Sequence, residues 1–225
     1  MVSELVKPIL RHSPPYLPVP TRVSPPLPEH PGKRVFDFVV ALLSVVFLFS
    51  WLGVLIGLLI RLTSSGPILF IQTRTGWGGQ PFRCFKFRTM YHDAPGGSFR
   101  QTLRNDDRVT PLGRFLRRTN LDELPQILNV LLGEMSIVGP RPHPIPLDAQ
   151  YWETLPTYPQ RYRARPGLTG LAQIRGCRGA VQTTHTMQQR LRYDLFYIKR
   201  SSLHFDFYIC LQTLLAMFRG NSDAF

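Results

Sequence analysis

The chain has few cysteines, and none lies in a metal-binding or redox pattern. Its 225 residues contain three, at Cys84, Cys177 and Cys210, which are odd in number and widely spaced. They form neither a Cys-x-x-Cys pair nor a Cys/His ligand spacing, so no disulfide framework and no zinc site is predicted. The simplest expectation is a reduced domain that faces the cytoplasm.

The chain is also poor in acidic residues and has no internal repeat. Lys and Arg number 27 against 14 Asp and Glu, which gives a formal net charge of +13. The length and the absence of repeats favour one catalytic or binding unit. The charge predicts an anionic partner, for which nucleic acid, anionic lipid and phosphorylated small molecules compete. The cations are scattered through loop motifs and form no recognition helix, which argues against nucleic acid.

The sequence does contain one long apolar run, from Val35 to Ile60. As a helix it would reach about 39 Å, more than the roughly 30 Å of a hydrocarbon core, so lipid becomes the favoured anionic partner. The run is flanked by Lys33-Arg34 and by Arg61, and positive charge on both sides marks neither end as the outer one. A re-entrant helix fits this pattern, a simple spanning helix is the alternative, and Gly53 and Gly57 allow a bend.

Composition divides the chain into three parts. Residues 1–32 hold nine of the 21 prolines, which predicts an extended, disordered cytoplasmic tail. Residues 33–62 form the membrane helix, and residues 63–225 form one domain facing the cytoplasm. Within that domain, Ile68 to Arg74 and Phe82 to Phe87 flank a Gly-rich turn and predict a β-hairpin.

Two helices are expected in the middle of the chain. Segment 108–118 places leucine and phenylalanine on one side and arginine on another, which suits an amphipathic helix lying on anionic head groups. An ordinary surface helix is the alternative. Segment 121–132 is strongly apolar and is predicted to be a helix that begins near Asp122, with Pro125 in its first turn.

The start of this second helix carries the most specific chemistry. A carboxylate at a helix N-terminus meets unpaired N–H groups and stays ionised, so Asp122 is expected to be an anion. The alternative is that Asp122 only caps the helix, or that Asn120 and Glu123 form a capping box. Arg141 follows in a Gly/Pro-rich loop and suits a bidentate phosphate contact. Asp122 and Glu123 together suit Mg²⁺.

Other polar patterns are less specific. Lys86 and Arg88 end the second strand, where alternation places both on one face, and a solvated cationic strand is the alternative. Segment 163–176 has glycines spaced for close approach of the backbone to a ligand, which alone is a weak phosphate-loop signal. In the last helical region, Asp194 either pairs with Arg190 or Arg192 or faces the site.

Six segments, taken in order, resemble one known family. They are KRVFDF at 33–38, GPILFIQTRTG at 66–76, KFRTM at 86–90, LDELPQILNVLLGEMSIVGPRP at 121–142, RPGLTGLAQIRG at 165–176 and YDLFYIKRSSLHFDF at 193–207. Over residues 33–225 the chain resembles the bacterial sugar transferases, the monotopic phosphoglycosyl transferases, in their small form.

The resemblance implies an α+β, mainly helical fold on a membrane, with a re-entrant N-terminal helix, interfacial amphipathic helices and a small β-hairpin. It also implies an enzyme of the bacterial inner membrane, with its catalytic domain facing the cytoplasm. Such an enzyme moves a hexose 1-phosphate from a UDP-hexose to undecaprenyl phosphate and releases UMP, which begins a repeat unit of exopolysaccharide, capsule or O-antigen. Its expected partners are these two substrates and anionic membrane lipids, and a homodimer is left open.

The resemblance also implies residue roles. Asp122 should attack the sugar-bearing phosphate and give a covalent phosphosugar intermediate, while Glu123, with Asp122, holds Mg²⁺. The candidate substrate-binding residues are Lys86, Arg88, Arg141, Arg165, Gln173, Arg175 and Asp194.

Two features depart from the family pattern or refine it. Ser50-Trp51 stands where related enzymes usually have Ser-Pro, so a bend must come from Ser50, Gly53 or Gly57. The segment 176–183 and the end at 223–225 resemble members that transfer glucose or galactose phosphate. The alternatives are an N-acetylhexosamine-1-phosphate transferase of the same family and a non-enzymatic membrane adaptor.

Overall fold

The computed structural model describes residues 25–92, 100–103 and 106–218. Its helical segments are α2 (Lys33–Ser44), η2 (Val45–Gly53), α3 (Val54–Thr63), η3 (Trp77–Gly79), α4 (Pro111–Thr119), η4 (Leu121–Glu123), α5 (Gln126–Leu132), α6 (Ile145–Trp152), η5 (Tyr158–Arg163), α7 (Leu171–Ile174), α8 (Thr184–Arg200) and α9 (Leu203–Phe218). Its strands are β1 (Leu69–Thr75), β2 (Pro81–Phe87), β3 (Ser136–Val138) and β4 (Gly167–Thr169). The expectation of a mainly helical chain with a small hairpin is confirmed.

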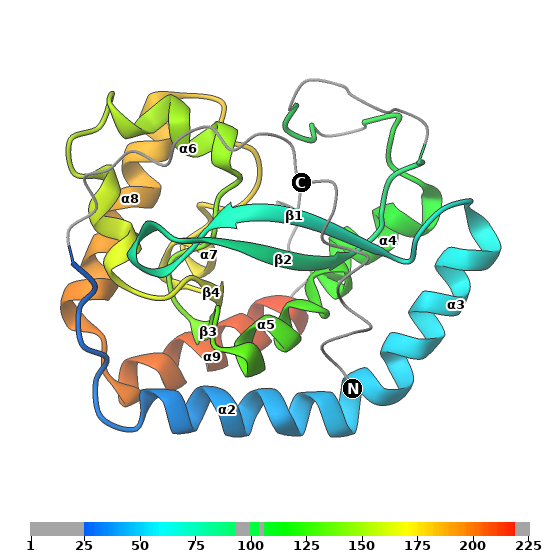
Figure 1. Cartoon of the computed structure of the whole chain (residues 1–225), viewed down its shortest axis with the longest axis horizontal. Coiled ribbons are helices and arrows are strands. Elements are labelled where there is room, and N and C mark those ends of the chain that lie inside the picture. The colour runs from blue at the N-terminus through cyan, green and yellow to red at the C-terminus, as the bar shows by residue number, and fades with distance from the viewer. Residues whose placement is uncertain (1–24, 93–99, 104–105, 219–225) are drawn as a thin grey trace.

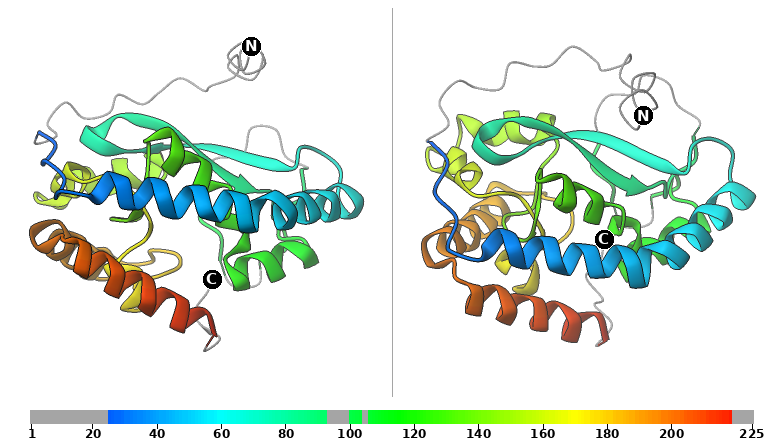
Figure 2. Two further views of the ribbon diagram at one scale, coloured as in Figure 1. Left: turned by 90° about the horizontal axis from the view of Figure 1, so that it is seen from below. Right: turned by 60° about the horizontal axis from the view of Figure 1, so that its bottom comes forward.

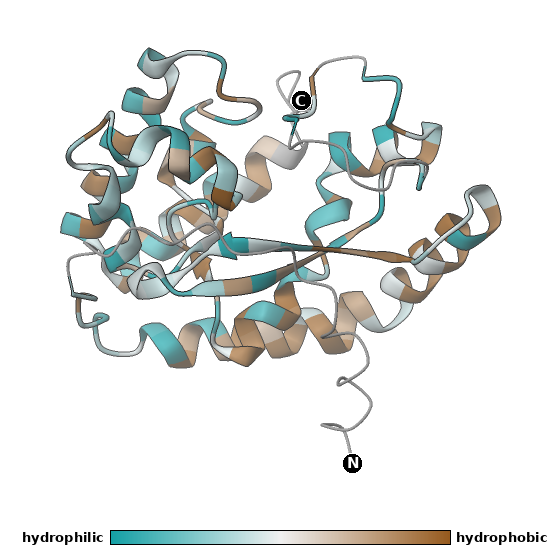
Figure 3. Ribbon diagram, turned by 45° about the horizontal axis from the view of Figure 1, so that its top comes forward, coloured by the Kyte–Doolittle hydropathy of each residue, from teal (hydrophilic) through white to brown (hydrophobic). Residues whose placement is uncertain are grey.

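One continuous helix, Lys33–Thr63, joins α2, η2 and α3. By length and composition it could cross a membrane, and only 17% of its most apolar stretch is buried. Many of its large apolar side chains are exposed, among them Phe47 at 71%, Val54 at 70% and Leu62 at 73%. Figure 3 shows this apolar character along the helix. Water does not favour such a surface, so the helix needs an apolar covering.

The helix bends within η2, and α3 leaves at an angle to α2 (Figure 1). This stretch is π-helical, and such stretches are a recognised cause of kinks. Two side chains donate to carbonyls one turn earlier: Ser50 Oγ to Val46 at 2.7 Å, and Trp51 Nε1 to Phe47 at 2.7 Å. The bend therefore lies where Ser50 and Gly53 were expected to produce it, whereas Gly57 lies beyond it in α3.

The cations before the apolar run do not face outward as flanking charges. Lys33 is 4% exposed, and its Nζ lies 2.7 Å from Asp206 Oδ2 in α9 and 3.3 Å from Asp37 Oδ1. Arg34 donates to the carbonyl of Val130 at 2.7 Å. A buried ammonium needs acceptors, so Lys33 joins α2 to the body of the protein. Its charge therefore does not indicate on which side of a membrane this end of the helix lies.

The apolar surface continues onto α9, which lies on the far side of α2 from the hairpin (Figure 2). Phe36 of α2 and Phe207 of α9 are in ring contact, with centroids 4.9 Å apart. Phe207 is still 60% exposed, and Leu211 and Leu214 extend the same exposed set. Two helices far apart in sequence thus share one apolar boundary of the molecule.

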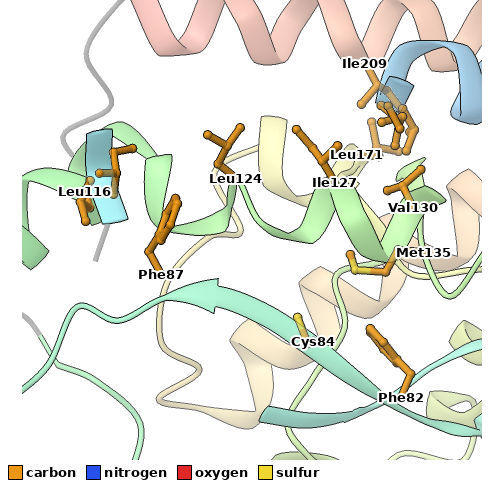
Figure 4. Close-up of a cluster of buried hydrophobic side chains, with 14 of the residues drawn as sticks. Phe82, Cys84, Phe87, Leu116, Leu124, Ile127, Val130, Met135, Leu171 and Ile209 are labelled. Atoms are coloured by element: carbon orange, nitrogen blue, oxygen red, sulfur yellow. The ribbon is translucent and has the colours of Figure 1, made fainter. Parts of the chain in front are cut away.

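The predicted hairpin is confirmed. β1 and β2 pair antiparallel from Leu69↔Phe87 to Thr75↔Pro81, and the turn uses Gly78 at φ 62°. Phe82 and Cys84 of β2 point toward α5, which carries Ile127 and Val130 (Figure 4). This contact forms part of the main hydrophobic core and fixes β2 beside η4.

The apolar segment 121–132 is not one helix, which corrects the expectation. Residues 121–123 form the tight turn η4, and α5 begins only at Gln126 with Pro125 at its N-cap. Proline has no N–H to donate, and the bond from Leu124 N to Leu121 O closes a three-residue turn instead of an α-turn. The capping box is absent as well, since Asn120 adopts φ 62° and makes no side-chain cap.

The amphipathic helix forms as α4 and is capped by Thr110, whose Oγ1 accepts from Gly113 N at 2.9 Å. Its apolar side is divided between two environments. Leu116 is 1% exposed in the core, whereas Phe115 is 48% exposed. The expectation that this whole side lies on head groups is therefore wrong for Leu116, because packing against the core competes with the surface.

Two of the three glycines in segment 163–176, Gly167 and Gly170, approach other backbone, whereas Gly176 has open space beside it. Gly139, Gly167 and Gly170 lie so close together that a Cβ on any of them would meet main-chain atoms of this group or its neighbours. The parallel pairing of β3 with β4 requires this approach. Gly167 and Gly170 therefore have a packing role, and the phosphate-loop interpretation of the rest of the segment stays a prediction.

Part of the predicted tail contacts the body. Leu27 N donates to the carbonyl of Arg163 at 2.9 Å, and Glu29 lies 2.5 Å from Arg165 Nη1. Residues 25–32 therefore have partners that composition alone did not indicate. The rest of the predicted tail, residues 1–24, lies outside the described residues.

Candidate active site

The site is centred on η4, which presents Asp122 and Glu123 side by side. The left-handed conformation of Asn120 ends α4 and turns the chain into η4. The two carboxylates are 8% and 6% exposed, so they are largely removed from water. Burial of two adjacent acids is costly unless cations surround them.

Glu123 has such partners. Lys86 Nζ of β2 donates to its Oε1 at 2.7 Å, and Arg141 Nη1 donates to its Oε2 at 3.0 Å, with Arg141 Nη2 also bonded to Oε1. Burial raises the pKa of Glu123, but Arg141 and Lys86 outweigh it and hold that pKa well below its usual range. Glu123 is therefore an anion that joins the hairpin and the loop after β3 to η4.

Asp122 differs from its neighbour. Among the residues that the structure describes, none donates a hydrogen bond to its carboxylate. Burial raises its pKa, Lys86 opposes that rise and Glu123 adds to it. The expectation that a helix N-terminus would favour the ionised form is wrong, because no α-helix starts at Asp122 and desolvation dominates. The result is a less solvated, more basic carboxylate than an ordinary aspartate.

Two further arginines face this pair and were not predicted as site residues. Arg117 of α4 lowers the pKa of Asp122, and its Nε is fixed by Thr89 Oγ1 at 2.8 Å. Arg117 lies five residues before Asp122, and this short separation in sequence could have indicated that the two are close in space. Arg178 helps to lower the pKa of Glu123, and it lies in a loop between α7 and α8 that no local pattern connects to η4.

Two predicted cations make their contacts elsewhere. Arg88 donates to the carbonyl of Ser64 at 2.8 Å, because β2 ends at Phe87 and the alternation that would align it with Lys86 stops there. Arg165 pairs with Glu29 and stacks over the ring of Trp77, with its guanidinium carbon 4.0 Å from the centroid. Only Lys86 and Arg141 of the four candidate cations meet the carboxylates.

The remaining predicted residues occupy other surroundings. Gln173 is 9% exposed, and its Nε2 donates to the carbonyl of Leu168 at 3.3 Å. Arg175 is exposed at the end of α7. Residues 223–225, which the sequence analysis linked to the choice of sugar, lie outside the described residues. For Gln173 and Arg175 the structure gives a position but no contact with the carboxylates.

Asp194 pairs with a residue that the sequence analysis did not consider. Its Oδ2 lies 2.7 Å from Arg161 Nη2, and both side chains are buried. The predicted pairing with Arg190 or Arg192 is therefore corrected to Arg161, which is 33 positions away in η5. Arg161 also donates to the main-chain carbonyl of Arg141 at 2.8 Å, so this pair lies directly behind the site.

The carboxylates at η4 offer few protein ligands for Mg²⁺. No group of three His, Cys, Asp or Glu side chains capable of holding a metal occurs among the described residues. Both oxygens of Glu123 are taken by cations, whereas Asp122 is free of hydrogen bonds from described residues. This set fits Mg²⁺ held by one carboxylate together with substrate phosphates, a common arrangement for that ion, and does not fit a protein cage.

The site thus combines one buried, unpaired carboxylate with several cations. A carboxylate in this state is suited to attack an electrophilic phosphorus, since it has no hydrogen bond to break first. The surrounding Lys and Arg side chains suit an anionic, phosphate-bearing substrate. The arrangement is compatible with the binding and transfer of a phosphate-bearing group.

Comparisons with known proteins agree with this chemistry. A protein-family model described as bacterial sugar transferase matches residues 29–220. The chain is 52% identical over 182 residues to a protein of Caulobacter vibrioides named UDP-glucose:undecaprenyl-phosphate glucose-1-phosphate transferase. A protein of Escherichia coli K12 with the same name is 45% identical over 188 residues. Exopolysaccharide production protein PSS of Rhizobium leguminosarum is also 45% identical over 188 residues.

The three relatives differ in length. The alignments cover 81%, 84% and 82% of this chain, respectively. They cover 68% of the Caulobacter protein, 40% of the Escherichia coli protein and 94% of the Rhizobium protein. The chain therefore spans less than half of one of these relatives and nearly all of another.

Proposed function

The chain belongs to the bacterial sugar transferase family, and on that premise we propose that it transfers glucose 1-phosphate from UDP-glucose to undecaprenyl phosphate. The products are UMP and undecaprenyl diphosphate glucose, the first lipid-linked unit of an exopolysaccharide. The names of the relatives support glucose as the sugar. The alternative donors are UDP-galactose and UDP-N-acetylhexosamines.

One observation carries the proposed chemistry: Asp122 is buried, lacks a hydrogen bond from the described residues and is surrounded by cations. We infer that an Oδ atom of Asp122 attacks the sugar-bearing phosphorus. The bond between this phosphorus and the bridging oxygen breaks, and UMP leaves with that oxygen. A phosphate oxygen of the lipid then attacks the same phosphorus and releases the carboxylate.

Charge explains the need for the cations. An anion that attacks a diphosphate is repelled by it, and the leaving UMP gains negative charge in the transition state. Lys86, Arg117 and Arg141 lie where they counter both effects. Mg²⁺, held by Asp122 or Glu123 with the substrate phosphates, would neutralise further charge on the diphosphate.

We also infer where the protein resides. The apolar helix Lys33–Thr63 would lie in the bacterial inner membrane, entering and leaving by the cytoplasmic face, while residues 64–225 remain in the cytoplasm. The bend in η2 and the exposed side chains of α2, α3 and α9 support this arrangement. Cysteines placed at Val35 and Leu62 should both react from the cytoplasmic side with an impermeant maleimide. Reaction of the two from opposite sides would instead indicate a spanning helix.

The test of the activity is UMP release by the full chain in lipid nanodiscs with Mg²⁺ and undecaprenyl phosphate. UDP-glucose should support release, with UDP-galactose and UDP-N-acetylglucosamine slower. Without the acceptor, UMP should appear as a burst that does not exceed one equivalent per enzyme, because the phosphosugar remains on Asp122. If folded protein releases no UMP with any of these donors, the proposal is overturned in favour of a membrane adaptor.

A further inference from the structure

A buried histidine lies behind the site and contacts two arginines from different elements. His143, in the loop after β3, is 2% exposed. Its Nδ1 lies 2.5 Å from Arg161 Nη1 of η5, and its Nε2 lies 3.3 Å from Arg190 Nη1 of α8. Burial, Arg161 and Arg190 all lower the pKa of His143, so the ring is neutral. A neutral imidazole lets two guanidinium groups lie close without a third charge.

Each of these arginines holds the backbone of a loop that faces the carboxylates. Arg161 donates to the carbonyl of Arg141 at 2.8 Å and is neutralised by Asp194. Arg190 donates through Nε to the carbonyl of Cys177 at 3.1 Å and through Nη2 to that of Gly179 at 3.0 Å. The residue between these two carbonyls is Arg178.

The loop 176–179 needs such support. Gly176 and Gly179 have φ of 79° and 88°, a left-handed conformation that reverses the chain on either side of Cys177-Arg178. The two bonds from Arg190 close this turn from behind. Because a guanidinium presents its donors in a rigid fork, one side chain can hold both carbonyls at once.

The side chain of Arg178 has no hydrogen bond or ion pair with the described residues. It is partly buried and lies close enough to Arg141, Glu123 and Asp122 for their charges to act on its pKa. Lys86, Arg117, Arg141 and Arg178 thus lie near the two carboxylates, and cations outnumber carboxylates there. The diphosphate of a nucleotide sugar carries two negative charges.

We propose that Arg178 binds the diphosphate of the nucleotide-sugar donor, and that Arg190 is its positioning residue, acting through the carbonyls of Cys177 and Gly179. The inference rests on the proposed function for the identity of the donor. Arg141 and Arg178 then hold the diphosphate from two loops, and His143 links the two arginines that support those loops.

The experiment compares Arg178→Ala, Arg190→Gln, the double variant and Arg192→Gln in the full chain. Arg192 is the matched control, since it is an exposed arginine two positions along the same helix. We expect Arg178→Ala to raise the KM for UDP-glucose by about 10- to 100-fold, the range for a lost charged hydrogen bond. Arg190→Gln should raise it by roughly 10-fold with a smaller change in kcat.

The double variant separates positioning from simple structural damage. If Arg190 acts through Arg178, the double variant should have the KM of Arg178→Ala alone. If the KM increases of the two single variants multiply in the double variant, the positioning role is overturned. An equal KM increase in Arg192→Gln would overturn it as well. Arg190→Lys keeps the charge but loses the paired guanidinium donors, and it replaces Arg190→Gln if that variant does not fold. Its KM for UDP-glucose should lie between those of wild type and Arg178→Ala.

A binding measurement keeps the inference distinct from the proposed activity. UDP with Mg²⁺ is titrated calorimetrically into wild type and Arg178→Ala. UDP binding that is about 10- to 100-fold weaker in Arg178→Ala supports the diphosphate role. It does so even if wild type releases no UMP, since the absence of release would overturn only the transferase proposal. Equal UDP binding by both proteins would overturn the assignment of Arg178.

Discussion

Asp122 and Asp148 are both buried aspartates, yet their surroundings are opposite. Asp122 is 8% exposed and accepts no hydrogen bond from the described residues. Asp148 of α6 is 3% exposed and accepts from Thr75 Oγ1 at 2.5 Å, from Tyr158 Oη at 2.6 Å and from Tyr162 Oη. Burial raises the pKa of both carboxyls. Burial alone therefore does not distinguish a reactive carboxylate from a structural one.

The difference lies in what each carboxylate is bonded to. Asp148 accepts from hydroxyls that are packed among aromatic rings, such as the stacked pair Trp152 and Tyr162, and Arg161 is near enough to lower its pKa. Asp122 is surrounded by cations that leave its oxygens free. A satisfied buried acid stabilises the fold, whereas an unsatisfied one keeps its lone pairs available for a substrate or a metal ion.

The largest predicted effect is the loss of activity in Asp122→Asn. An amide is not a nucleophile for phosphorus, so UMP release should fall by roughly 10⁴-fold or more. The Tm should stay level or rise, because the variant removes a buried charge that makes no hydrogen bond with the described residues. UMP release and thermal unfolding of the same preparation check both parts. A large drop in Tm would show that Asp122 is structural, like Asp148.

The matched variant Asp148→Asn should show the reverse pattern. It leaves hydroxyl donors without a carboxylate acceptor, which costs about 2 to 3 kcal/mol and lowers Tm by roughly 5 to 10 °C. UMP release per folded molecule, measured well below the Tm, should stay within a few-fold of wild type. A loss of activity comparable to that of Asp122→Asn would show that the Asp148 cluster takes part in the chemistry.

The third prediction concerns pH. Asp122 must be ionised to attack, and its pKa is raised, so the proton returns at a higher pH than for an ordinary aspartate. The acid limb of kcat/KM should therefore lie above the ordinary value of an aspartate and fall as pH is lowered through it. Because Arg117 lowers the pKa of Asp122, Arg117→Gln should move the limb to still higher pH.

The control for this profile is Asp148→Asn, which should leave the limb where it is. A limb at the ordinary aspartate value in wild type, or one that Arg117→Gln moves to lower pH, would contradict the assignment of the limb to Asp122.

The smallest predicted effect comes from Tyr162→Phe. It removes one of the three hydroxyls bonded to Asp148 but keeps the ring, which stacks on Trp152 with centroids 5.6 Å apart. The cost should be about 1 kcal/mol, or roughly 2 to 4 °C in Tm, with activity unchanged. Thermal unfolding at one pH, with Tyr208→Phe on exposed α9 as the control, measures it. No change in Tm would mean that two hydroxyls already satisfy Asp148.

Several features could be predicted because they depend on neighbours in sequence. The apolar helix, the hairpin and the end of α5 at Leu132 follow from hydrophobic runs, strand alternation and turn residues. The adjacency of Asp122 and Glu123 is itself a sequence property. Where local rules failed, a nearby constraint had been underweighted, as at Pro125, which delays α5 by one turn.

Other features depended on contacts between distant segments. Asp194 pairs with Arg161, Arg178 approaches Glu123 and Arg88 turns to Ser64, although each cation was one of many similar ones in a basic chain. The rise in the pKa of Asp122 was not predicted for the same reason, since desolvation depends on what packs over the carboxylate.

The sequence by itself determined that an apolar helix would accompany a basic body with an Asp-Glu pair, because hydrophobicity and charge are properties of the residues themselves. Only the tertiary structure decided which cations face that pair, which carboxylate stays unbonded and where the backbone holds Arg141 and Arg178. The physical reason is that ion pairing and desolvation act over a few ångströms in space, and the chain brings together residues that lie tens of positions apart.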